Sequence, residues 1–154
     1  MGELLSVWLL LQYAAENIAL FSGGLFAGAA IYISLTEQPP RTRLSLTDIL
    51  ALSRTNSRRT RVVLASLACI AGGAGVIAAA LGASHAWLAG GVLHAAAVVL
   101  LLSQGVRITA ELESLGSDRE YESLGRRLLE RQALHFSLLS LIGLAALALY
   151  ILKP

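Results

Sequence analysis

The sequence predicts an all-α integral membrane protein, a four-helix bundle with short amphipathic segments on its cytoplasmic side. Hydrophobic residues make up 56% of the 154 residues, charged residues only 14%, and the mean hydropathy is +0.69. A soluble domain of this size could not bury so much apolar surface. Four apolar stretches reach the roughly 20 residues that a helix needs to cross a bilayer. Their unbroken composition excludes barrel strands, which alternate over roughly 10 residues.

These stretches predict a single transmembrane domain covering residues 1–154. Its helices are expected at residues 17–35, 62–81, 87–106 and 133–152. The apolar run of the first helix begins near residue 4, interrupted by Gln12, Glu16 and Asn17. Two interpretations stay open: one long tilted helix, or a separate interfacial segment that leaves Glu16 near the outer headgroups. The first three residues carry no positive charge, so a cleaved signal peptide is not expected.

The arginines indicate how the chain is oriented in the membrane. Six arginines lie in the segment between the first and second predicted helices, and five lie in the segment between the third and fourth. Lys153 is the one remaining basic residue. The positive-inside rule places these loops in the cytoplasm and both termini outside, in the plasma (inner) membrane. The pI near 9.0 then reflects loops that contact anionic lipid headgroups. The expected partner is therefore the lipid bilayer and not a nucleic acid.

Small residues predict close helix contacts. Gly24 and Gly28, with Gly23 and Ala27 beside them, form a small-residue stripe on the first helix. A second stripe on the next helix consists of Gly72, Gly73 and Gly75. Such stripes let helix backbones approach closely in lipid. The pattern leaves open whether the contacts lie within one chain or between copies in a homo-oligomer. A single cysteine excludes an intrachain disulfide and a cysteine-based metal site.

Two polar segments carry helix-start signals. Ser45 and Asp48 have N-cap spacing ahead of an apolar run, which predicts a short amphipathic helix lying on the membrane. Ser117 and Glu120 repeat this spacing before the fourth apolar stretch. The fourth helix is therefore expected to extend into the cytoplasm.

Polar residues within or beside the membrane are the candidates for function, because they are costly there. No P-loop, GxSxG, HExxH or CxxC motif accompanies them. An outer layer is expected to hold Gln12, Glu16, Asn17, His85 and His94. An inner layer is expected to hold Glu37, Gln104, Arg107, Glu111 and His135. The helical rise separates His94 from His135 by more than about 10 Å, too far to share one metal or haem iron.

Several of these residues also have a purely structural interpretation. His94 is able to donate to a carbonyl of a neighbouring helix, and Arg107 is able to reach the interface by snorkelling. Glu16 and Asn17 are able to mark a helix entry. Glu37 is harder to explain, because a carboxylate at a helix C-terminus opposes the helix dipole. We therefore expect a cationic partner for it among the nearby arginines.

Three stretches resemble a known family: GLFAGAAIYISLTEQPPR, VRITAELESL and LLERQALHFSLLSLIGLAALAL. They are similar to the anthrone-oxygenase-like family of small four-helix membrane proteins, a domain of unknown function. Its first helix is glycine-rich and ends in a Glu-His-Pro-type motif, and its last helix carries a histidine. By position, the resemblance implies functional residues at Glu37, Pro39, Thr109 and His135. Where the family often has histidine, asparagine and tryptophan, this chain has Gln38, Ala110 and Gln132.

The resemblance implies that dioxygen oxidises an anthrone or similar polycyclic phenol to a quinone, without a cofactor. The expected substrate is thus an apolar aromatic small molecule. His135 would act as the base, Arg107 would stabilise the enolate or peroxide, and Glu37 would orient one of them. Two alternatives stay open. One is a non-enzymatic membrane scaffold or assembly partner, and the other is a haem or quinone carrier that uses His94 and His135 separately.

Overall fold

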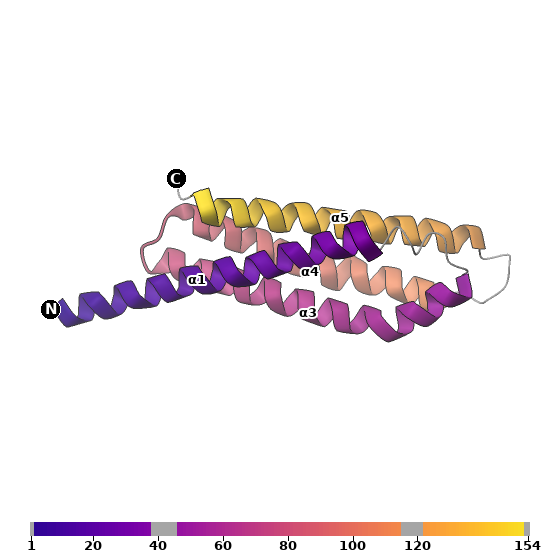
Figure 1. Ribbon diagram of the computed structural model, residues 1–154, viewed down its shortest axis with the longest axis horizontal. Coiled ribbons are helices and arrows are strands. Elements are labelled where there is room, and N and C mark those ends of the chain that lie inside the picture. The colour runs from indigo at the N-terminus through magenta and orange to yellow at the C-terminus, as the bar shows by residue number, and fades with distance from the viewer. Residues whose placement is uncertain (1, 38–45, 115–121, 153–154) are drawn as a thin grey trace.

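The computed structural model describes residues 2–37, 46–114 and 122–152. These residues form long α-helices and one short π-helical turn, and contain no strand (Figure 1). The elements are α1 (Gly2–Tyr32), η1 (Ile33–Glu37), α3 (Leu46–Ala80), α4 (His85–Ser114) and α5 (Glu122–Leu152). Four helices are long and apolar enough to cross a membrane, with η1 continuing the first of them. The predicted all-α membrane fold is confirmed.

The helices form a ring in which α1 packs on α3, α3 on α4, α4 on α5, and α5 on α1. A tight turn joins α3 to α4. Gly82 in this turn has a φ of +104°, which glycine adopts without strain. Gly2 and Leu152 both lie at the end of the bundle that holds this turn (Figure 1). Glu37, Leu46, Ser114 and Glu122 lie at the opposite end, which we call the arginine end. The start of α1 and the end of α5 therefore lie at the same end of the bundle, as expected for a chain that runs along it four times in alternating directions.

Tyr150 organises the core near the α3–α4 turn. Its buried ring stacks on Trp87 at a centroid distance of 4.8 Å, and its hydroxyl donates a 3.0 Å hydrogen bond to the carbonyl of Ala71. Gly75 and Gly90 lie against the same ring, so closely that a Cβ atom at either position would overlap it. The absence of a side chain at these two positions is what lets Tyr150 enter the bundle.

On both helices, part of the predicted small-residue stripe lies at a helix contact within the described residues. On α3, an added Cβ at Gly72 would lie 3.2 Å from an α4 carbonyl oxygen, so this glycine does lie at a helix contact. On α1, Gly24 and Gly28 have nothing within 4 Å of an added Cβ. The buried contact falls on Gly23, which belongs to the same predicted stripe, because each residue turns the helix face by about 100°. Gly24 and Gly28 therefore make no close contact with the residues that the structure describes.

The helices at the arginine end are longer than predicted. The segment expected to form a separate amphipathic helix is the beginning of α3, which continues into the apolar stretch without interruption and bends near this end (Figure 1). No proline or glycine occurs between residues 46 and 71, so nothing in the sequence stops the helix. The predicted extension of the fourth helix is confirmed, since α5 begins at Glu122. The proposed capping residues Ser45, Ser117 and Glu120 lie outside the described residues.

The ambiguity at the start of the chain is resolved in favour of one helix. Residues 2–32 are continuous α-helix, so residues 4–15 do not form a separate segment. The N-terminal part of α1 projects beyond the other helices (Figure 1). Its large apolar side chains, among them Trp8, Leu10 and Tyr13, are exposed.

Candidate functional site at the arginine end of the bundle

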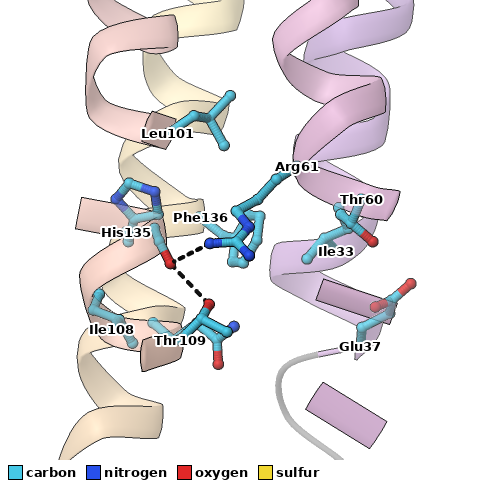
Figure 2. A pocket seen from close by; sticks show the side chains of 11 residues that line it. Ile33, Glu37, Thr60, Arg61, Leu101, Ile108, Thr109, His135 and Phe136 are labelled. Carbon is cyan, nitrogen blue, oxygen red and sulfur yellow. Dashed lines mark hydrogen bonds between the residues drawn. The ribbon is translucent and has the colours of Figure 1, made fainter. Parts of the chain in front are cut away.

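A small closed pocket lies between the helices at the arginine end (Figure 2). Its volume of about 20 Å³ has room for about one water molecule. Its wall is formed by η1, α3, α4 and α5. The lining residues are Ile33, Glu37, Thr60, Arg61, Leu101, Gly105, Ile108, Thr109, Gln132, His135 and Phe136. The pocket is thus an apolar space into which a few polar groups converge.

His135 on α5 is the most unusual of these groups. Its side chain is only 5% exposed, and neither ring nitrogen has a hydrogen-bond partner within the described part of the chain. A neutral imidazole presents one donor and one acceptor. Leaving a buried donor or acceptor unpaired costs roughly 1–3 kcal/mol, so native proteins rarely do it without a functional reason. The ring is therefore available to hydrogen-bond a ligand.

Arg61 supplies the positive charge of the pocket. Its Nη1 atom donates a 3.1 Å hydrogen bond across to the carbonyl of Gly105 on α4 (Figure 2). Thr109 Oγ1 donates to the same carbonyl at 2.8 Å. An added Cβ at Gly105 would lie 3.5 Å from Arg61 Cδ and 3.6 Å from His135 Nε2. Gly105 thus brings the arginine and histidine side chains close to the same point of α4.

The π-helical turn η1 brings Glu37 to the pocket. In this turn Ile33 is buried and Glu37 is half-buried, and both line the cavity. Single π turns occur often at functional sites, where they re-aim side chains at the end of an α-helix. In Figure 2, Arg61 lies between His135 and Glu37. Glu37 is positioned to act on the arginine more directly than on the histidine.

Arg107 does not belong to this pocket. Its side chain is 81% exposed and pairs with Glu111 Oε1 at 2.9 Å, one turn along α4. Both residues line an outer groove of about 460 Å³ between α4 and α5, together with Gln104, Arg131, Leu134 and Leu138. His135 and Ile108 line the groove and the pocket alike. His135 therefore stands in the wall between them, with Arg61 on one side and Arg107 on the other.

Sequence reasoning missed Arg61 because it was assigned to a loop. A usable signal was nevertheless present in the spacing of the helix. Arg61 precedes the buried residues Leu64, Ala68 and Ala71 by three, seven and ten positions. This is the spacing of one helix face, so an unbroken α3 turns Arg61 inward.

His94 lies in the core and away from the pocket. It is fully buried, and its ring stacks on Tyr150 at 5.6 Å and meets the edge of Phe26 at the same distance. Nδ1 lies 3.0 Å from the carbonyl oxygen of Gly90 within α4 and 3.5 Å from the hydroxyl oxygen of Tyr150 on α5, so its contact with a neighbouring helix is to a hydroxyl and not to the expected carbonyl. Nε2 faces the α1 backbone at Gly23, where an added Cβ would lie 3.3 Å away. His94 is thus enclosed by α1, α4 and α5.

The remaining outer-layer residues do not gather around His94. Glu16 is buried and accepts a 3.0 Å hydrogen bond from Gln12. Asn17 is exposed and donates to the carbonyl of Tyr13 at 2.7 Å, and His85 is exposed at the start of α4. Within residues 2–37, 46–114 and 122–152, no three His, Cys, Asp or Glu side chains are grouped so that they could hold a metal ion.

The structure does bring together residues that the sequence analysis singled out. Glu37, Thr109 and His135, which the anthrone-oxygenase-like resemblance marked by position, line the same pocket. Pro39 lies outside the described residues. No family model, curated protein or solved structure matches this chain. The function must therefore be argued from the pocket itself.

Proposed function

We propose that the protein removes a proton from an apolar aromatic compound at the arginine end of the bundle and oxidises the resulting anion with dioxygen. The observation that carries this proposal is the buried His135 imidazole, whose two ring nitrogens have no partner within the described residues and which lies near Gly105, as the Arg61 side chain does. A neutral imidazole is the side chain best suited to accept a proton near neutral pH. A fixed cation beside it stabilises the anion that forms.

Anthrones carry a weakly acidic C–H group and fit this chemistry. His135 takes that proton, and the enolate places its negative charge toward Arg61. Dioxygen accepts electrons from the enolate carbon and forms a C–O bond there, which gives a hydroperoxide after the proton returns. Loss of one water molecule from the hydroperoxide leaves the quinone, so the atoms balance with dioxygen as the only oxidant.

The groove between α4 and α5 offers room for the rings. Its volume of about 460 Å³ lies within the roughly 300–1,000 Å³ range of small-molecule sites, whereas the closed pocket is too small for a ring. Ile108, Leu134 and Leu138 make part of its wall apolar. Since His135 borders both spaces, a change of its side-chain rotamer would open the wall between them, and the enolate oxygen of a ring in the groove would then face Arg61 in the pocket. The bilayer then delivers the substrate, because the groove faces outward from the bundle.

The resemblance to the anthrone-oxygenase-like family supports the same proposal. It marks Glu37, Thr109 and His135 by position, and these residues share one pocket. Glu37 is assigned the task of orienting Arg61. Arg61 replaces Arg107 in the proposal, because the Arg107 side chain is exposed and engaged by Glu111.

The proposal is tested by dioxygen uptake and quinone formation in lipid discs supplied with an anthrone. We expect uptake above that of empty discs. Arg61→Gln should lower the rate by roughly 10²–10³-fold, the usual effect of losing one anion-stabilising group. The matched control is Arg107→Gln, which removes the same charge from the other side of His135 and should change the rate by less than about threefold.

Two results would contradict this assignment. Uptake no greater than that of empty discs would exclude the oxidation itself. A large loss in Arg107→Gln with normal activity in Arg61→Gln would place the anion in the outer groove and return Arg107 to the site.

A second candidate function is that of a membrane scaffold or assembly partner. It is favoured by the projecting N-terminal part of α1 and by Gly24 and Gly28, which make no close contact with the residues that the structure describes. This function needs no turnover. It predicts that Gly28→Leu disrupts an oligomer or a complex, as measured by size-exclusion chromatography with light scattering, while any oxidation rate stays the same.

We also propose that the arginine end faces the cytoplasm of the cell and that both termini lie outside, as the positive-inside rule implies. On a Cys69→Ala background, Arg58→Cys and His85→Cys place one exposed thiol at each end of the bundle. A membrane-impermeant maleimide should label His85→Cys in right-side-out vesicles and Arg58→Cys in inside-out vesicles. The reverse pattern would invert the orientation.

A further inference from the structure

A second groove of about 440 Å³ lies between α3 and α4 on the outside of the bundle. Its α3 wall is formed by Val62, Ala65, Ser66 and Cys69, which continue the helix face that begins with Arg58. Its α4 wall is formed by Val98, Leu102 and Val106. Apart from its arginine end, the groove is therefore largely apolar, and its α3 wall includes the small side chains of Ala65, Ser66 and Cys69.

The length of the groove matches one leaflet of a bilayer. Arg58 and Cys69 are eleven positions apart on α3, which corresponds to about 16 Å at the helical rise. Half of the roughly 30 Å hydrocarbon core is about 15 Å. An acyl chain that starts near Arg58 would thus end near Cys69, at the middle of the membrane.

The charge of the groove is purely positive. Arg58 is exposed at its outer end and has no ion-pair partner within the described ranges of the chain. Arg61 also borders the groove, although its guanidinium is turned toward Gly105 in the pocket. No carboxylate lines this groove, in contrast to the α4–α5 groove, where Glu111 engages Arg107.

We propose that the α3–α4 groove binds one anionic phospholipid, with its phosphate on Arg58 and an acyl chain along the Val62–Cys69 face. An exposed arginine at the membrane surface attracts anionic headgroups, and the apolar channel continues from it toward the membrane centre. This inference is independent of the proposed oxidation, because the groove lies on the other side of α4 from Leu134 and Leu138.

Native mass spectrometry of the protein, extracted from discs that contain equal amounts of phosphatidylglycerol and phosphatidylcholine, tests the proposal. We expect one phosphatidylglycerol to be retained in preference to phosphatidylcholine. Arg58→Gln should lower its retention by about fivefold, the effect of one arginine near an anionic surface. Arg59→Gln is the matched control, since Arg59 is equally exposed and adjacent but does not line the groove. The Arg59→Gln variant should retain phosphatidylglycerol as well as the natural chain does.

A second variant tests the acyl channel separately from the charge. Ala65→Phe fills the groove with a ring and should lower retention of both lipids, while circular dichroism confirms that the helices remain. Equal retention of the two lipids by the natural chain would overturn the proposal. Equal losses of phosphatidylglycerol retention in Arg58→Gln and Arg59→Gln would also overturn it, because they would show that the lipid responds to the overall surface charge and not to the groove. A lipid-free dimer would show that a second copy occupies the groove instead.

Discussion

His135→Ala is expected to lower the rate of anthrone oxidation by roughly 10²–10⁴-fold, the usual contribution of a positioned general base. The imidazole is the group that takes the proton, and it is enclosed where bulk water cannot substitute for it, at 5% exposure. The bundle should stay folded, because neither ring nitrogen holds a hydrogen bond within the described residues. Dioxygen uptake and circular dichroism on the same sample separate the two effects.

His135→Gln tests whether the loss is one of chemistry or of packing. Glutamine fills much of the same volume and is able to hydrogen-bond, but its amide does not accept a proton near neutral pH. It should therefore be nearly as inactive as alanine. His85→Ala removes an exposed histidine at the far end of the bundle and should retain full activity. A glutamine variant with normal turnover would show that His135 is not the base.

Gly90→Ala is expected to destabilise the bundle by about 3 kcal/mol, the upper part of the usual range for overpacking. The new methyl group would lie 2.8 Å from Tyr150 Cδ1 and 2.9 Å from Cζ, and still closer to Cε1. The Tyr150 ring has little freedom to move away, because it is stacked on Trp87 and its hydroxyl donates to Ala71. Unfolding in a denaturing-detergent titration, followed by circular dichroism, measures the change.

Gly73→Ala is the matched control for this substitution. Gly73 is also a helical glycine in an apolar segment, but nothing lies within 4 Å of an added Cβ. Alanine favours helix over glycine by up to about 1 kcal/mol, so stability should be unchanged or slightly higher. Tyr150→Leu combined with Gly90→Ala should cost less than the sum of the two single changes, because the clash is removed with the ring. Additive costs would show that Gly90 and Tyr150 do not press on each other.

The membrane helices and the extension of the fourth helix at the arginine end were predicted from the sequence, whereas the extension of α3 was not. Apolar length and the absence of proline or glycine act locally along the chain, so they need no partner to be recognised. The importance of Glu37, Thr109 and His135 was also proposed before the fold was known, from a resemblance whose motifs are short. Their gathering around one cavity was not derivable, because it depends on how three separate helices are rotated against each other.

The arginine of the pocket shows most clearly what could not be predicted from the sequence. Arg107 and Arg61 both lie near the membrane edge of their helices, and the sequence favoured Arg107 because it stands within a predicted span. Packing turned Arg107 outward to Glu111 and Arg61 inward to Gly105. The same rotation placed Gly23, and not Gly24, against His94.

The sequence by itself therefore determined that this is a helical membrane protein and which residues lie near the arginine end. Apolar length and position along the chain are properties of the segments alone, and they set depth in the bilayer through the helical rise of about 1.5 Å per residue. Only the tertiary structure decided which side chains face one another. In lipid no hydrophobic effect selects the inward face of a helix. Close packing selects it, as in the fit of Tyr150 against Gly75 and Gly90, and that fit exists only once the helices are assembled.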